Sequence, residues 1–219
     1  MKIPFRSISV IALLLFASVV VSRRAHGLDL EVYRAAGRSL LEGRTDLYAR
    51  DFAINASLDY HYPPVFLFLF LPLVLVSNQL AAFIWTFLTL GIVYVAVQQI
   101  KLVTNDIFRL AHIKFWVVSV VASLLCMKYF LFNLKYLNVH LIVLSLTVIA
   151  WCLVIRRKLI LASALLAGAI AFKVFPALLL PYFLLKGEFR FVVLTIAFLT
   201  AFAVVRCQSF RYPPLYNRQ

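Results

Sequence analysis

The chain has 219 residues, 64% of them apolar, and its mean hydropathy is +0.98. This apolar fraction is higher than that of soluble globular domains, so the composition excludes a soluble enzyme and predicts an integral membrane protein. The net charge of +14 does not indicate nucleic-acid binding, because nearly all basic residues lie in short connections where they contact headgroups and orient the chain.

Apolar stretches bounded by charged or turn residues follow one another along the chain. A spanning helix needs roughly 20 apolar residues, and several of these stretches are shorter. The sequence therefore predicts an all-α, polytopic transmembrane bundle of seven or eight segments, some too short to cross alone. The stretches are 8–22, 65–76, 80–100, 115–132, 139–155, 159–172, 175–185 and 191–205.

The first stretch follows two basic residues, Lys2 and Arg6. This pattern fits a signal anchor with a cytoplasmic N-terminus in a multi-pass protein of the cell membrane. A cleaved signal peptide is the alternative, but "VVVSRR" lacks a small-x-small cleavage site and further apolar stretches follow.

The basic turns suggest how the remaining segments are oriented. Placing "RRK" (156–158) and "KGEFR" (186–190) inside satisfies the positive-inside rule, but then 65–100 crosses only once and 65–76 is re-entrant or broken. In the alternative, 65–76 crosses and every later loop changes side, which puts "RRK" outside. Both arrangements leave residues 23–62 as the first extracytoplasmic loop.

This loop contains the stretch "GLDLEVYRAAGRSLLEGRTDLY", which is rich in charged residues. Apolar residues recur at helical spacing, which predicts an interfacial helix over 30–42 ended by Gly43. Arg34 and Arg38 lie on other faces of this helix, where they could meet lipid phosphates.

Asp29 directly precedes the predicted helix, and two interpretations of it are open. It could be an N-cap that accepts a backbone N–H. It could also be a catalytic base at the outer membrane surface, because glycosyl transfer from a polyprenyl-phosphate sugar needs a group that removes the acceptor hydroxyl's proton. The phosphate leaves readily when a cation stabilises it, so one carboxylate with nearby Arg or Lys is sufficient.

Several motifs together suggest a family. The stretches "DLEVYRAAGRSLLEGRTDLY", "YHYPPVFLFLFLPLVLV" and "AAFIWTFLTL" are followed by "YLNVHLIVLSLTVIAWCLVIRRKLILASALLAGAIAFKVFPALLLPYFLLKGEFR". This order resembles the N-terminal half of the polyprenol-phosphate-dependent mannosyltransferases of glycosyltransferase family eighty-seven, members of the C-type membrane superfamily. The resemblance implies the C-type glycosyltransferase fold, with the catalytic aspartate of the first external loop at Asp29.

By the same resemblance, Tyr62, Pro63 and Pro64 mark the loop's return to the membrane, and Lys173 and Pro176 form a later element. Tyr62 fits an interfacial aromatic belt or stacking on a sugar ring. Lys173 fits a grip on the lipid phosphate or a side chain that snorkels from a helix end.

The chain departs from the family pattern in two respects. The family's Gly-Gln-x-Asn turn appears here as "KYLN", which keeps Asn138 as a candidate binding residue but has Tyr136 in place of glutamine. Family members are also about twice as long, so the sequence predicts a transferase-like region over 1–206, an atypical polar tail over 207–219, and a truncated product that could be inactive.

The expected partners are a polyprenyl-phosphate-linked sugar donor, a lipid or glycan acceptor and membrane lipids. No cofactor is expected, and His26, His61, His112 and His140 show no metal-binding spacing. The rival hypothesis is a non-enzymatic membrane protein, transporter-like or a scaffold, in which Asp29 only caps a helix.

Overall fold

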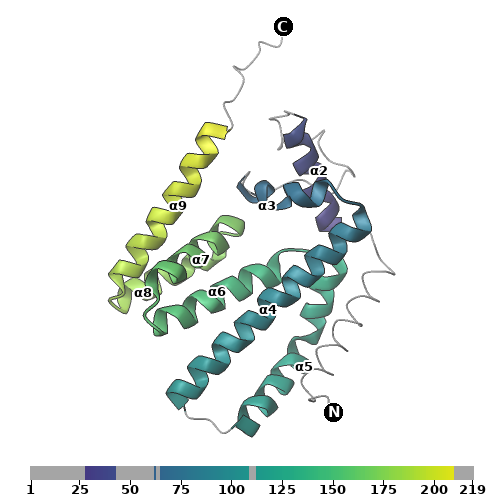
Figure 1. The fold of residues 1–219 in the computed structure, drawn as a ribbon. Helices are drawn as coiled ribbons and strands as arrows, with labels where there is room; N and C mark the ends of the chain where they lie inside the picture. The colour runs from purple at the N-terminus through teal and green to yellow at the C-terminus, as the bar shows by residue number, and fades with distance from the viewer. Residues whose placement is uncertain (1–27, 43–61, 63–64, 109–111, 210–219) are drawn as a thin grey trace, which may run out of the picture.

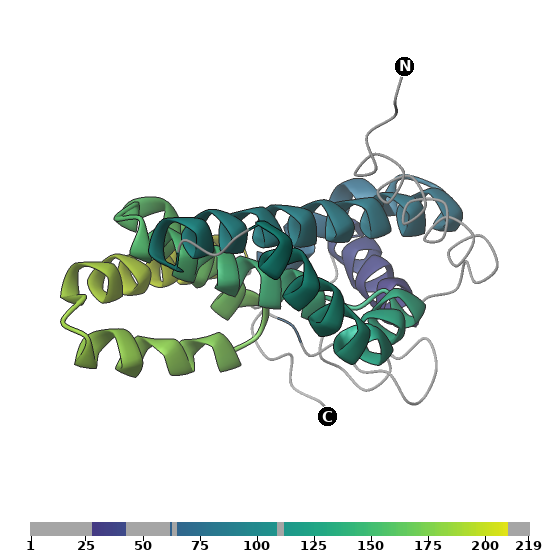
Figure 2. The ribbon, with the colours of Figure 1, turned by 90° about the horizontal axis from the view of Figure 1, so that it is seen from below.

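The computed structural model describes residues 28–42, 62, 65–108 and 112–209. Every regular element in these ranges is a helix, and the helices form an elongated bundle with α2 and α8 at opposite ends (Figures 1 and 2). The all-α prediction is therefore confirmed for this part of the chain. The elements are α2 (Leu28–Leu41), α3 (Val65–Val74), α4 (Asn78–Phe108), α5 (His112–Tyr136), α6 (His140–Ile155), α7 (Leu159–Phe172), η2 (Phe175–Leu178), α8 (Leu179–Leu185) and α9 (Phe189–Ser209).

The helix bounds follow the predicted apolar stretches closely. The stretch 159–172 coincides with α7, whereas α4, α5 and α9 extend beyond their stretches at both ends. In the described part of the chain one helical window, Asn78–Thr104, is long and apolar enough to cross a membrane, and four other apolar helices are shorter. The predicted stretch 8–22 lies outside the described residues.

Helix α3 is too short to cross a membrane alone. It has 10 residues, which span about 15 Å, half of the roughly 30 Å hydrocarbon core. Both of its ends also lie against α2, because Tyr62 hydrogen-bonds to Tyr33 and the Arg34 guanidinium bonds Val76 O beyond the other end. This geometry supports the arrangement in which 65–76 is re-entrant.

Helix α2 packs on α3 through Tyr33, whose side chain is 1% exposed. Apolar burial of this kind holds a short amphipathic helix in place when its intrinsic helical stability is small. Four aromatic rings surround Tyr33 at centroid distances of 4.7 to 6.4 Å: Tyr62, Phe66, Phe70 and Trp85.

Gly37 marks the closest approach of α2 to α3. A Cβ atom at this position would lie 2.7 Å from Val74 Cγ2, which is closer than real contacts allow. Gly37→Ala is therefore expected to lower the free energy of unfolding by about 1–3 kcal/mol through overpacking.

Thermal unfolding in detergent measures this effect, and Gly91→Ala in α4 is the matched control. No atom lies within 4 Å of a Cβ at Gly91, so this change is expected to be neutral or slightly stabilising through helix propensity. Equal destabilisation by the two substitutions would contradict the close α2–α3 contact.

The second half of the bundle is built from α4, α6, α7, α8 and α9. Helices α6 and α7 form an antiparallel hairpin with small residues between them, and Ala162, Ser163 and Ala167 are fully buried. The Ser163 hydroxyl donates a hydrogen bond to Phe191 O at 3.1 Å, which ties α7 to α9. This hairpin places the start of α6 and the end of α7 at one end of the bundle.

The opposite end carries two turns of the same type. Arg157 and Gly187 both have positive φ, 61° and 75°, and each follows the end of a helix. In both turns the N–H of this residue and the N–H of the next residue donate to carbonyls of the last helical turn. The Arg157 guanidinium then meets the Glu188 carboxylate at 2.7 Å, and Arg156 donates to Gln99 Oε1 at 3.3 Å. The "RRK" and "KGEFR" turns and the later part of α4 therefore share one end.

Candidate functional site

The candidate site forms where four segments meet at the α2 end of the bundle. Asp29 comes from the first turn of α2, Tyr62 precedes α3, His140 begins α6, and Lys173 follows α7. Helices α2 and α3 lie together at this end in Figure 1, and α7 runs toward them. Three of the predicted site residues, Asp29, Tyr62 and Lys173, are thus brought together from distant parts of the sequence.

Asp29 is the second residue of α2, because the helix begins at Leu28, two positions earlier than predicted. The prediction that Asp29 precedes the helix as its N-cap is therefore wrong. A carboxylate in the first turn is still favoured by the helix dipole. Its side chain is partly buried, and this burial raises the pKa of the Asp29 carboxyl above its usual range, while the nearby Lys173 ammonium opposes the shift. A raised pKa brings a carboxylate closer to the range suited to a general base.

Lys173 is in extended conformation at the end of α7, with φ −146° and ψ 134°. Its backbone N–H bonds to Ala169 O at 3.0 Å, so the helix ends with the lysine side chain at the same end of the bundle as Asp29. Burial lowers the pKa of Lys173, and the negative charge of Asp29 opposes this shift. The two groups therefore act on each other electrostatically.

Tyr62 connects Asp29 and Lys173 to the aromatic core. Its hydroxyl accepts a hydrogen bond from Tyr33 at 3.1 Å, and its ring stacks on Phe66 at 4.9 Å between centroids. Lys173 Nζ lies 6.0 Å from the centroid of the Tyr62 ring, within cation–π range. Burial raises the pKa of Tyr62, which keeps the hydroxyl protonated at neutral pH.

His140 is the contact that the sequence analysis missed. Its Nε2 atom lies 2.5 Å from Lys173 Nζ. The two residues are separated by 33 positions in the sequence, so no local spacing indicates that they meet. The signal in the sequence is the predicted helical hairpin 139–155 and 159–172. In an antiparallel hairpin, the first residue of the first helix and the residue that follows the second helix lie at the same end.

The structure directs Arg34 away from this cluster. Its side chain is 4% exposed, and its guanidinium donates to Asn78 Oδ1 and Val76 O, with Val74 O at 3.5 Å. These bonds fix α2 to the turn between α3 and α4. Arg38, also predicted to contact phosphate, is on the exposed face of α2.

Asn138 shapes the turn before α6. Its Oδ1 atom accepts hydrogen bonds from the Asn133 side chain and, at 3.1 Å, from the backbone N–H of His140. Asn138 is 3% exposed, so in this structure its carbonyl oxygen organises the backbone that carries His140. Whether it also touches substrate stays a prediction.

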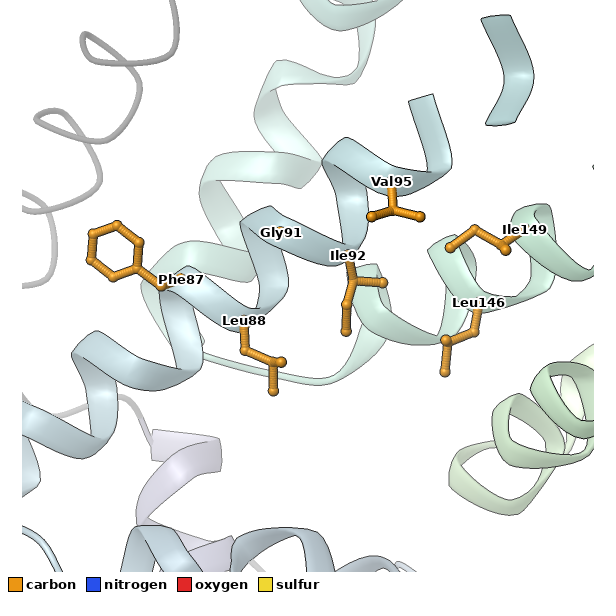
Figure 3. Close-up of a pocket in the computed structure, with 7 residues that line it drawn as sticks. All are labelled: Phe87, Leu88, Gly91, Ile92, Val95, Leu146 and Ile149. Atoms are coloured by element: carbon orange, nitrogen blue, oxygen red, sulfur yellow. The ribbon is translucent and has the colours of Figure 1, made fainter. Parts of the chain in front are cut away.

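A separate apolar pocket lies between α4 and α6 (Figure 3). It has a volume of about 350 Å³, and none of the polar residues of the candidate site line it. Within the described ranges, no three His, Cys, Asp or Glu side chains come together as metal ligands. The pocket lining is Phe87, Leu88, Gly91, Ile92, Val95, Leu146 and Ile149.

The polar cluster combines a carboxylate with an ammonium group, and this combination suits one type of chemistry. A carboxylate can remove a proton from an attacking hydroxyl, while an ammonium group next to it stabilises an anionic leaving group. The Tyr62 ring offers a π-face that can support a sugar ring. Groups of these kinds suit the transfer of a sugar from a phosphate leaving group to an alcohol.

Comparison with known proteins identifies related sequences. The sequence model described as glycosyltransferase family 87 matches residues 60–216. The chain is also 30% identical over 213 residues to the polyprenol-phosphate-mannose-dependent alpha-(1-2)-phosphatidylinositol mannoside mannosyltransferase of Mycolicibacterium smegmatis. This match covers 88% of the chain and 47% of the relative, so the chain spans about half the relative's length. No solved structure matches significantly.

Proposed function

Because the chain belongs to glycosyltransferase family 87, a membrane family, we propose that it transfers mannose from a polyprenyl-phosphate donor at the extracytoplasmic face. The relative named above uses polyprenol-phosphate-mannose, which supports the choice of donor, and its acceptor is a phosphatidylinositol mannoside. A lipid or glycan alcohol is the acceptor class that we propose here.

In the proposed reaction the acceptor oxygen attacks the anomeric carbon of mannose. The new C–O bond forms as the bond from that carbon to the phosphate oxygen breaks, and polyprenyl phosphate leaves with the electron pair. Asp29 takes the acceptor's proton, and Lys173 stabilises the charge on the departing phosphate. The observation that carries the proposal is that Asp29, Lys173 and Tyr62 come together from distant segments: the charges of Asp29 and Lys173 shift each other's pKa, and Lys173 Nζ lies 6.0 Å from the centroid of the Tyr62 ring.

We assign the remaining candidates by their position. Arg38 is exposed on α2 and is proposed to contact phosphates at the membrane surface. Arg34 is proposed to position α2, because its donors are already directed to Asn78 and the turn carbonyls. Tyr62 is proposed to support the sugar through the part of its ring that does not stack on Phe66.

The distribution of charge supports the proposed orientation. The two turns at the far end of the bundle carry five basic residues, and positively charged loops favour the cytoplasmic side. The end with Asp29 and Lys173 then faces the extracytoplasmic side, as the arrangement with a re-entrant 65–76 requires. The basic residues of the two turns are Arg156, Arg157, Lys158, Lys186 and Arg190.

A transfer assay in reconstituted membranes tests this function. Radiolabelled mannose on polyprenyl phosphate should move to a lipid or glycan alcohol, and nucleotide-activated mannose should give no product without a lipid donor. Equal transfer from the nucleotide sugar would reject the proposed donor class.

The pH dependence of transfer tests the role of Asp29. A base acts only when deprotonated, so kcat at saturating donor should fall as the pH falls through the pKa of Asp29. Because burial raises this pKa, the midpoint should lie above 3.8, the ordinary value. If the fall of kcat at low pH persisted unchanged in the residual activity of Asp29→Asn, the titrating group would be one other than Asp29.

A further inference from the structure

His140 is the one titratable side chain of the candidate site to which the proposed reaction gives no role. It is exposed, so a ligand can reach it, and its ring nitrogen Nε2 is in contact with Lys173. The position of its backbone is set by Asn138, which accepts the His140 N–H bond. The turn between α5 and α6 therefore holds this imidazole next to the lysine.

The contact favours one protonation state of His140 when Lys173 is charged. A charged lysine ammonium carries only donors, so beside it the Nε2 atom of His140, at 2.5 Å, accepts the hydrogen bond through a lone pair. The ring proton is then on Nδ1 and the imidazole is neutral. A second proton on His140 would place two positive charges next to each other, which Coulomb repulsion opposes.

The charges of the four side chains of the candidate site, Asp29, Tyr62, His140 and Lys173, cancel when the imidazole is neutral. From α2, Asp29 contributes one negative charge, and after α7, Lys173 contributes one positive charge. Tyr62 is uncharged. Lys135 of α5, whose Nζ lies 4.9 Å from the centroid of the Tyr136 ring, is not one of these four side chains and is not counted with them. A partly buried site with no net charge has a small desolvation cost.

An anionic ligand would change this balance by one unit. A phosphodiester bound by Lys173 takes over the ammonium's hydrogen bond and leaves Nε2 of His140 without its donor. The added negative charge also favours the imidazolium, which can then donate to the same anion. One proton taken up with the anion restores a net charge of zero.

We propose that His140 and Lys173 together form the binding site for the donor's phosphodiester group, and that His140 takes up one proton as this anion binds. The identity of the ligand rests on the proposed function. The coupling itself depends only on the contact between the two side chains and on the charges around them.

The test uses the whole chain in nanodiscs of zwitterionic lipid, with farnesyl methyl phosphate as the probe. This phosphodiester keeps a single negative charge across the pH range, so any proton exchanged comes from the protein. Calorimetry in two buffers with different ionisation enthalpies gives the number of protons taken up per probe bound. We expect a value approaching one at pH above the His140 midpoint, and an affinity that rises up to about tenfold per unit fall in pH.

Two substitutions isolate the residues. His140→Gln keeps an oxygen that accepts from Lys173 but cannot titrate, so it should bind the probe with almost no proton uptake. Lys173→Met should lower affinity at least about tenfold at every pH. Lys186→Met is the matched control, because Lys186 also lies over a tyrosine ring, Tyr182, at 5.9 Å but at the other end of the bundle.

A second measurement does not need the probe. In the empty protein, 15N spectra of His140, assigned by their loss in His140→Gln, should show the tautomer with the proton on Nδ1. Any of four results would overturn the proposal: the Nε2–H tautomer in the native chain, probe binding without proton uptake, equal proton uptake in His140→Gln, or no probe binding by the native chain. If the probe binds with proton uptake but the protein does not transfer mannose, the proposed function fails and the anion site stands. If transfer depends on Asp29 but the probe binds without proton uptake, the proposed function stands and the anion-site proposal fails.

Discussion

Asp29→Asn is expected to lower mannosyl transfer at least about a hundredfold, because removal of a general base typically costs two to four orders of magnitude. Asparagine has nearly the same shape and still accepts hydrogen bonds, but it cannot take the acceptor's proton. The bundle should therefore fold normally and still bind donor. The readout is kcat at saturating donor, together with thermal unfolding of the same preparation.

Glu31→Gln is the control for this substitution, because Glu31 is the other acidic residue in the first turn of α2. It removes one negative charge from the same turn and should change transfer by less than about threefold. If Asp29→Asn kept full activity, Asp29 would be a structural residue of α2, and the non-enzymatic hypothesis would gain support for this chain.

Arg34→Met is expected to lower the free energy of unfolding by about 2–4 kcal/mol. The substitution removes a buried guanidinium and leaves Asn78 Oδ1 and the Val76 carbonyl without their donor. Transfer should fall as well, because α2 loses the bonds that hold Asp29 opposite Lys173. Thermal unfolding in detergent, with transfer measured below the transition, gives both quantities.

Arg38→Met is the matched control, since it removes the same charge from the exposed face of the same helix. Its effect on unfolding should stay within about 0.5 kcal/mol. If Arg34 contacted donor phosphate and had no structural role, Arg34→Met would raise the KM for donor without changing the unfolding temperature.

The helical segments could be predicted from the sequence because apolar runs in a membrane protein end at charged or turn residues. Helix α7 begins after Lys158 and ends before Lys173, and its predicted bounds agree with the structure. The ends of α4 could not be predicted in this way, because its polar residues, such as Gln98 and Gln99, are good helix formers and the helix continues through them.

The site was predicted in part, and the reason differs between residues. Asp29, Tyr62 and Lys173 were chosen from a family pattern, and the structure brings them together. Arg34 was interpreted as a surface cation because its helical spacing suggested an outer face. Its burial depends on the turn at residues 75–77, which no local pattern in α2 reports.

Contacts between side chains of different helices could not be predicted from the sequence, for a general reason. The contact between His140 and Lys173 requires the two helices of a hairpin to be of nearly equal length, 16 and 14 residues. If one of the two helices were longer by one turn, the side chains of His140 and Lys173 would be displaced from each other by about 5 Å along the bundle. Local signals do not fix helix ends to that accuracy.

The central claim is that Asp29 and Lys173 face the extracytoplasmic side of the membrane. Its most direct test is the labelling of single cysteines on intact cells with a membrane-impermeant maleimide. Cys126, Cys152 and Cys207 are first changed to serine, and one cysteine is then introduced as Arg38→Cys or Lys158→Cys. The account predicts that the cysteine at position 38 reacts from outside and that the one at position 158 reacts only after permeabilisation. The reverse pattern, with position 38 protected until the membrane is opened, would contradict it.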